Sequence, residues 1–395
     1  MSKGAPVDAK QYAKRNVRFF PVLKIFTKRV FLPLAAIYFM QTAHFTFAEI
    51  GILGSFYYVV NFLSDVPTGV FADRFGRAMS LRIGALLNVF ATLIYVFLPH
   101  KPAIFVGTFF EAVGYGFLLG AGEALIHDSL VVLGKVADYT KIVSRAQSLS
   151  LIVNAILLAL VPMTYSIDHR LPFLIGTLAY ASLGIVALIL KDVHHRSIER
   201  TNFGHLGLIF KSKGALGFAL SYGIIGALYT APSDFFNLAF KQMGLQPSLL
   251  GWVFSAASIV GAIIGIFFHR VRNFPLWAIL VGDSVLSVIP YIAVFIYSLP
   301  VLIVLVIASI SLWRYRRIIY QEKMLTKFPG QPKATLLSIM SNLEGLQQMW
   351  MPFAAGVIIG GLGLRSGFGV MALFGTTFAI VLLIFGKRFF AQRTT

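Results

Sequence analysis

Runs of about 20 consecutive apolar residues, the length of a transmembrane helix, recur along the whole chain between short charged, glycine- or proline-containing segments. Lipid offers the backbone no hydrogen bonds, so a membrane span must be a helix or part of a closed barrel. Because the runs do not alternate polar and apolar residues, they exclude the barrel. Hydrophobic residues make up 57% of the 395 residues and charged residues 12%, which leaves almost nothing for a soluble domain. The sequence therefore predicts an all-α integral membrane protein.

The apolar runs predict twelve transmembrane helices. Their limits are residues 18–41, 48–71, 79–99, 102–127, 146–166, 171–190, 215–239, 247–268, 275–297, 299–321, 335–360 and 366–386. A basic cytoplasmic linker at 191–214 separates an N-terminal six-helix bundle at 18–190 from a C-terminal one at 215–386, and residues 1–17 and 387–395 are tails. Two pseudo-symmetric six-helix bundles are typical of transporters built from repeats, with the substrate site between the halves.

Lysine and arginine test this topology, because cytoplasmic loops carry them in excess. Of the 34 such residues, the twelve-helix arrangement places only Lys101, Arg170, Lys241 and Arg365 in outer loops. Both tails are therefore predicted to be cytoplasmic, and the basic start, which no cleavable apolar segment follows, is not a signal peptide. The net charge of +19 reflects this asymmetry and attraction to anionic lipids of the bilayer. No basic patch is interleaved with aromatic residues, so we expect no nucleic-acid partner.

The sequence lacks the motifs of several other chemistries. It contains no cysteine, which excludes disulfides and thiolate sites. His194 and His195 have no second pair of ligands at helical spacing, so we expect no metal site. The nucleophile, zinc-protease and nucleotide-binding motifs are also missing, so we expect neither an enzyme, a cofactor nor an ATP-driven pump. Ion-coupled or facilitative transport remains.

The segment GVFADRFGR, residues 69–77, lies at the predicted inner turn between the second and third helices and resembles the signature of the major facilitator superfamily. Phe71 and Ala78 replace the usual Leu and Lys. The preceding DVPTG, GEALIHDSL at 122–130 and KATLLS at 333–338 are similar to motifs of a bacterial branch of that superfamily. The resemblance covers essentially the whole chain. It implies the twelve-helix transporter fold, a small-molecule substrate and the bacterial inner membrane, and we expect a monomer.

The resemblance also implies a function for this turn. In related transporters the aspartate that matches Asp73 faces the cytoplasmic N-terminus of the eleventh helix in the outward-open state, where the helix dipole favours a negative charge. The arginine that matches Arg77 links it to the aspartate that matches Asp128. We therefore expect a conformational latch that includes Asp65, Gly69, Asp73, Arg74, Gly76, Arg77, Glu123 and Asp128. The alternative is that Arg74 and Arg77 only mark the cytoplasmic side.

In this fold the first, fourth, seventh and tenth helices line the substrate cavity, and the first contains three cations. Lys24 and Lys28 are four residues apart and so share one face of a helix. Arg29 lies ~16 Å inside the entry at residue 18, near the midplane, where a cation should face a cavity because lipid solvates it poorly. The alternative is an interfacial amphipathic helix at 16–29, with the span beginning near Val30.

Three carboxylates are candidates for carrying a coupling proton. Glu111 lies ~14 Å inside the fourth helix, where desolvation favours its neutral form and a neighbouring cation favours its charged form. Glu344 has a similar depth in the eleventh helix, and Asp234 lies near the outer end of the seventh. The alternative for each is a structural ion pair, which for Glu111 would involve Arg29 or Lys28.

The tenth helix contains LWRYRRIIY at 312–320, which places Arg314 beyond the bilayer centre. Arg314 either snorkels to the cytoplasmic surface or forms an anion clamp, in which the guanidinium binds carboxylate or phosphate and Trp313 packs against an organic body. Asp283 in the ninth helix is interpreted as a packing or latch residue.

The substrate-binding residues predicted from these patterns are Lys24, Lys28, Arg29, Glu111, Trp313 and Arg314. Because three basic residues outnumber Glu111, we expect a positive cavity that selects negative charge or strong acceptors. The function expected is proton-linked export of a drug-like or metabolite solute, and the direction follows from the resemblance. The alternatives are uptake of an organic anion and, in another class, a membrane enzyme acting on lipid head groups.

Overall fold

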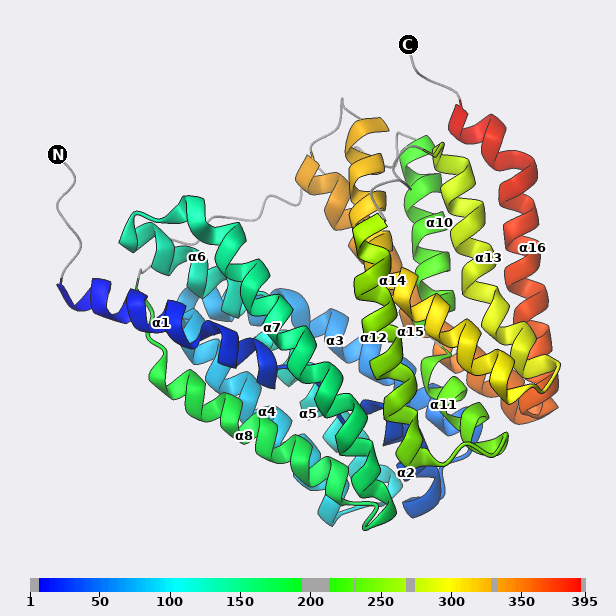
Figure 1. Ribbon diagram of the computed structural model, residues 1–395, viewed down its shortest axis with the longest axis horizontal. Coiled ribbons are helices and arrows are strands. Elements are labelled where there is room, and N and C mark those ends of the chain that lie inside the picture. The colour runs from blue at the N-terminus through cyan, green and yellow to red at the C-terminus, as the bar shows by residue number, and fades with distance from the viewer. Residues whose placement is uncertain (1–6, 194–212, 231, 268–273, 328–332, 392–395) are drawn as a thin grey trace. The chain divides into compact units, whose positions relative to one another are not determined.

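The computed structural model describes residues 7–193, 213–230, 232–267, 274–327 and 333–391, and the regular elements in these ranges are all helices (Figure 1). The N-terminal helices are α1 (Val7–Phe26), α2 (Leu32–Thr42), α3 (Phe47–Phe75), α4 (Arg77–Phe97), α5 (Lys101–Leu118), α6 (Ala121–Leu133), α7 (Tyr139–Leu160) and α8 (Leu171–Ile189). The C-terminal helices are α10 (Lys213–Thr230), α11 (Ser233–Gln242), α12 (Leu250–Phe267), α13 (Leu276–Phe295), α14 (Leu299–Lys327), α15 (Lys333–Leu362) and α16 (Leu364–Ala391). His194 and His195, considered above as metal ligands, lie outside the described residues.

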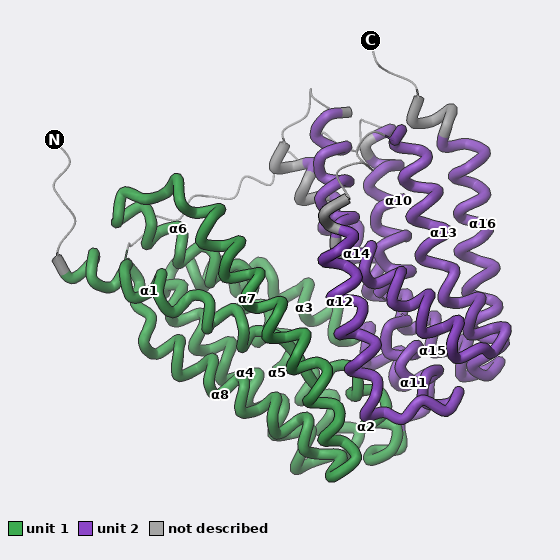
Figure 2. Tube along the Cα trace, in the orientation of Figure 1, with its two compact units in different colours: residues 1–44, 56–200 green, residues 45–55, 201–395 purple. Residues whose placement is uncertain are grey.

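The chain forms two compact units (Figure 2). The first comprises residues 1–44 and 56–200, and the second comprises residues 45–55 and 201–395. The boundary after residue 200 falls inside the predicted linker. The segment 45–55 differs from the predicted division, because it begins the second predicted span and yet packs with the second unit.

Small residues and one polar contact explain why the first part of α3 packs against α15. A Cβ atom on Gly51 would lie 2.9 Å from the Cα atom of Gly356, so the two backbones are in close contact there. The backbone N–H of Phe353, next to Pro352, donates a hydrogen bond to Ser55 Oγ at 2.9 Å. Close backbone approach and interhelical hydrogen bonds stabilise helix pairs in lipid, where the hydrophobic effect does not.

Eight of the described helices are long and apolar enough to cross a membrane, and a ninth is if the bent α14 counts as one span. The first, seventh and eleventh predicted spans are the three outside this set. The first and seventh are each divided into two shorter helices, and the eleventh contains the polar segment SNLEGLQQ at 341–348. The spans that fall short by hydropathy are therefore those with helix breaks or polar side chains.

The first span is not the continuous helix predicted at 18–41. Its helix begins earlier, at Val7, and stops at Phe26, and α2 resumes at Leu32. Side chains of α7 satisfy the carbonyl groups left open at this break: Ser150 Oγ donates to the Lys24 carbonyl at 2.8 Å, and Asn154 Nδ2 donates to the Ile25 carbonyl at 3.3 Å. The break therefore has partners of its own within the first unit.

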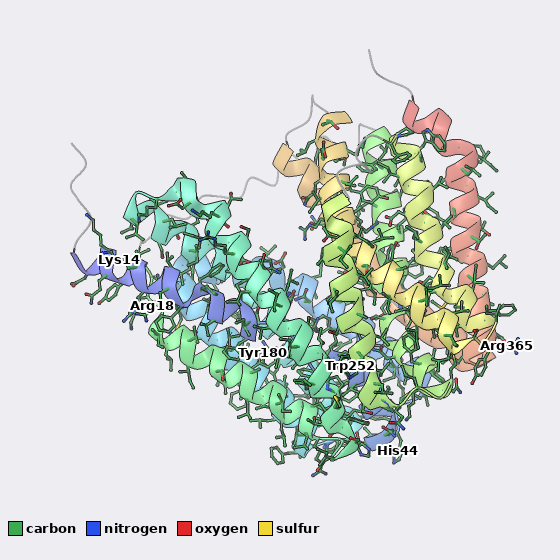
Figure 3. The ribbon with its side chains drawn as sticks, in the orientation of Figure 1. Lys14, Arg18, His44, Tyr180, Trp252 and Arg365 are labelled. Carbon is green, nitrogen blue, oxygen red and sulfur yellow. The ribbon has the colours of Figure 1, made fainter. Side chains whose placement is uncertain are left out.

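The helix α1 packs against the first unit along one face, and the second helix of this span begins at Leu32, close to the start near Val30 that the alternative interpretation gave. Ala13, Asn16, Phe20 and Leu23 are buried at helical spacing. Asn16 Nδ2 donates to Ser129 Oγ at 3.0 Å and to the Lys191 carbonyl at 2.8 Å. Other positions of the same helix carry the exposed side chains of Lys14 and Arg18 (Figure 3).

The fourth, seventh and tenth spans are also interrupted or bent. Gly120 separates α5 from α6 in the left-handed conformation, with φ of 74°, which glycine adopts at no steric cost. Pro232 precedes the first residue of α11, and α14 bends by 40° between Trp313 and Tyr315. All four helices predicted to line the cavity are thus interrupted or bent, which places polar backbone and side chains at membrane depth.

Candidate functional site

The break in the first span positions Arg29 against the middle of α5. Arg29 Nη1 lies 3.2 Å from Glu111 Oε1, and the Tyr95 hydroxyl of α4 donates to Glu111 Oε2 at 2.8 Å. The Tyr95 hydroxyl also lies 3.1 Å from Thr108 Oγ1. Glu111 is only 6% exposed. Both of its oxygens therefore have partners, and the predicted pair between Glu111 and Arg29 is present.

Aromatic rings complete the surroundings of Arg29. Its guanidinium carbon lies 4.9 Å from the ring centroid of Tyr57 on α3 and 5.3 Å from that of Tyr115 on α5. Such contacts stabilise a cation that has lost its water. Arg29 is thus held by one carboxylate and two rings that come from two helices, α3 and α5.

Lys24, on the same span, pairs with a different carboxylate. Lys24 Nζ lies 2.5 Å from Glu123 Oε1 on α6. The helix ends at Phe26, so Lys28 lies beyond its end and is exposed, and the predicted shared helix face of Lys24 and Lys28 is wrong. Glu123, predicted as part of the latch, instead pairs with Lys24.

In the second unit the buried guanidinium belongs to Arg316. Arg314 was predicted as the anion-clamp residue, but its side chain lies outside the described part of the chain. Arg316 is 4% exposed, and its Nε donates to Asp283 Oδ2 at 2.9 Å. Its Nη2 donates to the Tyr222 carbonyl at 2.6 Å, and its Nη1 lies 3.4 Å from Glu344 Oε1. Arg316 therefore joins α14 to α13, α10 and α15.

Four aromatic rings surround this guanidinium. Its central carbon lies 4.3 Å from the Tyr222 centroid, 4.7 Å from that of Trp313, 5.1 Å from that of Tyr320 and 6.0 Å from that of Tyr229. The predicted aromatic residue Trp313 thus packs against Arg316. The two units therefore each contain an arginine, half-buried Arg29 and buried Arg316, that is paired with carboxylate and flanked by aromatic rings.

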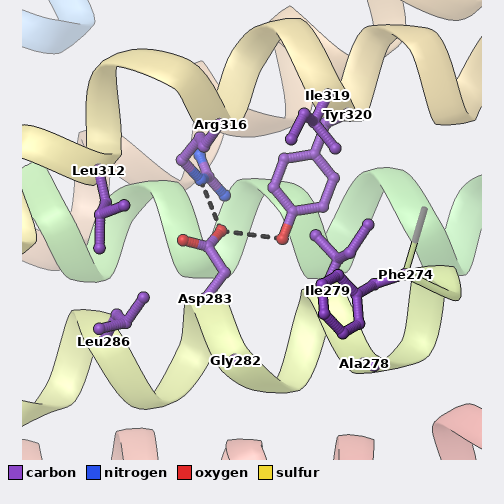
Figure 4. A pocket seen from close by; sticks show the side chains of 10 residues that line it. All are labelled: Phe274, Ala278, Ile279, Gly282, Asp283, Leu286, Leu312, Arg316, Ile319 and Tyr320. Carbon is purple, nitrogen blue, oxygen red and sulfur yellow. Dashed lines mark hydrogen bonds and ion pairs between the residues drawn. The ribbon is translucent and has the colours of Figure 1, made fainter. Parts of the chain in front are cut away.

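Asp283 has a larger role than the packing or latch function predicted for it. Its Oδ2 accepts from Arg316 Nε and from the Tyr320 hydroxyl, each at 2.9 Å, and its Oδ1 accepts from the Tyr229 hydroxyl at 3.1 Å. A pocket of about 190 Å³ between α13 and α14 reaches this carboxylate (Figure 4). Apart from Asp283, Arg316 and Tyr320, its lining is apolar. The sequence did not predict this arrangement, because it depends on which sides of α10, α13 and α14 face one another.

Asp234, the third proton-carrier candidate, lies in the first turn of α11, directly after the break in the seventh span. A carboxylate in that position is favoured by the helix dipole. This location is consistent with a structural role as much as with proton transfer.

The inner turn of the first unit contains the contacts that the family resemblance implies. Arg77 Nε lies 2.9 Å from Asp128 Oδ2 on α6, and Arg77 Nη2 lies 3.8 Å from Asp73 Oδ1. Asp65, Asp73 and Arg74 are exposed. Gly76 adopts φ of 103° at the start of α4, a conformation that favours glycine. The function of these residues as a latch stays a prediction.

Asp192 completes this turn and was not predicted. Its Oδ1 accepts hydrogen bonds from the backbone N–H groups of Arg77 at 2.8 Å and of Ala78 at 3.1 Å, so it caps the N-terminus of α4. Arg82 on α4 in turn donates to the carbonyls of Ala187 and Leu190 at the end of α8, at 3.0 and 2.9 Å. The acidic residue directly after the sixth apolar run was the available signal.

Known proteins resemble this chain over most of its length. The family model of the Major Facilitator Superfamily matches residues 22–315. A Bacillus subtilis (strain 168) protein described as an uncharacterized MFS-type transporter, YxaM, is 21% identical over 374 residues, which is 90% of this chain and 91% of that protein. The structure of the nucleoside transporter NupG matches with a TM-score of 0.79 and 14% identity, covering 95% of this chain and 99% of that one. The POT family transporter PepTSo matches with a TM-score of 0.73 and 11% identity, covering 97% and 99%.

Proposed function

Because the chain belongs to the Major Facilitator Superfamily, we propose that it moves a small organic solute across the membrane by alternating access, coupled to protons and in the direction of export. The observation that carries the proposal is the half-buried ion pair of Arg29 and Glu111, flanked by tyrosines at the break in the first span. Charges at membrane depth are expensive and mark solute and proton pathways. The chain is a transporter and not an enzyme acting on lipid head groups.

The site geometry supports both proton coupling and solute binding. A carboxylate that faces a cation can exchange a proton when the pair opens, because desolvation favours its neutral form once the cation moves away. The released guanidinium can then bind an anionic or acceptor group of the solute in two parallel hydrogen bonds. The candidates for the proton carrier are Glu111, Glu344 and Asp234, and the proposed solute contacts are Lys24, Lys28, Arg29, Glu111, Trp313 and Arg314.

Uptake of an organic anion is the second candidate, and Arg29 favours it. Its guanidinium lies against two tyrosine rings, so an anionic solute with a flat apolar body would find a charge and stacking partners together. The pairing of Lys24 with Glu123 leaves the site less positive than three cations would make it. Binding of an anion would therefore depend more on the single guanidinium of Arg29 than on the net charge of the cavity.

A ligand screen followed by flux measurements tests these proposals. The purified protein is screened by thermal shift against anions, neutral solutes and lipophilic cations. Nucleosides and peptides are included because solved structures of this fold include a nucleoside transporter and a POT family transporter in complex with a conjugated peptide. Stabilising compounds are then followed in proteoliposomes with and without a pH gradient. Flux that follows the gradient supports proton coupling, and its sign gives the direction. The appearance of a chemically altered product would contradict transport.

We further propose that the protein is a monomer in a bacterial inner membrane with both termini in the cytoplasm. The distribution of basic residues supports this orientation. The chain has no cysteine, so single cysteines introduced at Gly4 and Gln392 are specific probes. An impermeant thiol reagent should label neither position in intact cells and both after lysis. Labelling of either position in intact cells would contradict the proposed topology.

A further inference from the structure

Among the described side chains, the Arg316 network contains two carboxylates and one buried guanidinium, which is one negative charge more than this guanidinium can balance. Two carboxylates that share a cation interact strongly, so one of them binds a proton more readily than it would alone. We propose that Glu344 binds and releases the coupling proton, while Asp283 stays charged as the fixed partner of Arg316. This inference rests on the proposed proton-coupled transport and assigns its proton carrier.

Hydrogen bonds show which carboxylate stays charged. Asp283 accepts three of them, from Arg316 Nε, Tyr320 and Tyr229, at 2.9, 2.9 and 3.1 Å. Donors that converge on a carboxylate favour its charged form. The three donors therefore hold Asp283 in place as the fixed partner of Arg316.

Glu344 is held much less firmly. Its distance to Arg316 Nη1 is 3.4 Å, and its other hydrogen-bonding neighbour is the Tyr222 hydroxyl. Its side chain is 16% exposed, compared with 3% for that of Arg316. Because Glu344 is partly exposed, a proton can reach its carboxylate. Because its contact with Arg316 is long, that contact can break when the proton binds.

The groups that face Glu344 come from three helices. They are Tyr222 on α10, Arg316 and Arg317 on α14, and Asp283 on α13, which acts through Arg316. Arg317 is exposed, so solvent screens its charge. The segment 366–386 of α16 contains no titratable residue. On α3, Glu49 bonds the N–H and hydroxyl groups of Thr46 at its own helix start.

The glycines of α10 make room for the carboxylate and the guanidinium. A Cβ atom on Gly226 would lie 2.6 Å from Glu344 Oε1 and 2.9 Å from Arg316 Nη1, and one on Gly223 would lie 2.9 Å from the Leu343 carbonyl oxygen. The close approach of α10 keeps the pair desolvated on this side. Desolvation favours the neutral form of an acid whose ion pair is long.

The pair in the first unit differs in its charge balance. Glu111 has one cation at 3.2 Å and a tyrosine donor at 2.8 Å. One carboxylate and one guanidinium cancel, so no surplus negative charge drives proton binding there. Glu111 is therefore assigned to holding Arg29 in place.

Proton binding at Glu344 would loosen one link between α15 and α14. The proton goes to a carboxylate oxygen of Glu344, whose ion pair with Arg316 then becomes a neutral contact. Arg316 keeps Asp283 and the Tyr222 carbonyl as partners. This ion pair would thus link α15 to α14 when Glu344 is deprotonated, and it would be lost when Glu344 is protonated.

Infrared spectroscopy of the full-length protein in lipid nanodiscs tests the assignment without a known solute. A protonated carboxyl group has its own carbonyl stretching band, which should appear as the pH is lowered. The band should be lost in Glu344→Gln and retained in Glu111→Gln, and in Asp283→Asn it should appear only at a lower pH, because one carboxylate and one guanidinium then cancel. In Glu344→Asp it should persist at a changed frequency, which covers the case in which Glu344→Gln folds poorly.

Three outcomes would overturn the assignment. These are a band unchanged in both Glu344 variants, a band lost in Glu111→Gln, and the absence of any such band in the wild type. Solute flux in proteoliposomes separates this inference from the function on which it rests. Wild-type flux that ignores the pH gradient would contradict the proposed coupling, whatever the infrared titration assigns.

Discussion

At the scale of single residues, the two paired arginines show how this chain tolerates cations at membrane depth. Arg29 and Arg316 each contact carboxylate through guanidinium nitrogens and present their planar faces to tyrosine or tryptophan rings. A planar guanidinium suits both kinds of contact, whereas a lysine ammonium is a more strongly hydrated point charge. The difference between the sites is the number of carboxylates, one in the first unit and two in the second.

Arg29→Gln tests the solute contact. The variant should bind an anionic ligand from the thermal-shift screen more weakly by ~1.5 to 3 kcal/mol, the usual contribution of a hydrogen bond to a charged group, and neutral ligands should be less affected. Calorimetric titration of the two proteins measures the difference. Arg18→Gln, an exposed position on α1 (Figure 3), is the control and should leave binding unchanged. A preference for lipophilic cations that Arg29→Gln does not alter would exclude an anion site at Arg29.

At the scale of helices, the ends and contact faces depend on residues distant in sequence. α4 begins after Gly76, which has no side-chain cap of its own, and Asp192 supplies the missing acceptor from beyond α8. α10 approaches α15 closely because glycine occupies positions 223 and 226. Neither feature depends on hydrophobicity, and each can be tested by a single substitution.

Asp192→Ala should destabilise the first unit by roughly 0.5 to 2 kcal/mol, the usual effect of losing an N-cap side chain. Two N–H groups of α4 lose their acceptor, and the helix dipole loses a negative charge. Thermal unfolding in detergent measures the change. Asp138→Ala is the matched control, because Asp138 precedes α7 without a side-chain cap hydrogen bond. Equal Tm values for the two variants would show that the cap contributes nothing.

Gly226→Ala should lower stability by about 1 to 3 kcal/mol, because the added methyl group overlaps Glu344 and Arg316 and the side chains must shift. Gly282→Ala on α13 is the control, since no atom lies within 4 Å of the new Cβ position. That change should be neutral or slightly stabilising, as expected for Gly to Ala in a helix. If Gly226→Ala unfolds at the same temperature as Gly282→Ala, the close contact at Glu344 is wrong.

At the scale of the whole molecule, transport requires the two units to exchange between arrangements. The inner turn of the first unit is the predicted latch. In this turn Arg77 lies between Asp128 and the exposed Asp73. The family resemblance assigns the opposing partner of Asp73 to the start of the eleventh helix, which begins at Lys333. An exposed carboxylate near a helix N-terminus is a modest interaction that can be broken in each cycle.

Asp73→Asn preserves the shape of this turn and removes its charge. It should shift the equilibrium away from the outward-open arrangement by ~1 to 3 kcal/mol, the usual size of such a coupling. Distances between spin labels on the two cytoplasmic faces report the populations. Asp8→Asn, at an exposed position of α1, should leave them unchanged. Identical distance distributions for Asp73→Asn and the wild type would reject the latch.

Several features of the protein followed from the sequence alone. Helix positions were readable because the length of an apolar run and the rise of 1.5 Å per residue relate directly to the thickness of a membrane. The pairing of Glu111 with Arg29 was among the alternatives considered. The contact of Arg77 with Asp128 came from the resemblance of short motifs.

Only the tertiary structure decided which way each helix faces. In soluble proteins the apolar stripe shows the buried side, but in a membrane both lipid and protein interior are apolar, so the pattern of a span does not distinguish them. The burial of Arg316 therefore could not be predicted from LWRYRRIIY. The break after Phe26 depends on α7 side chains that satisfy the open carbonyls, and the sharing of Arg316 by Asp283 and Glu344 depends on four helices meeting at one point.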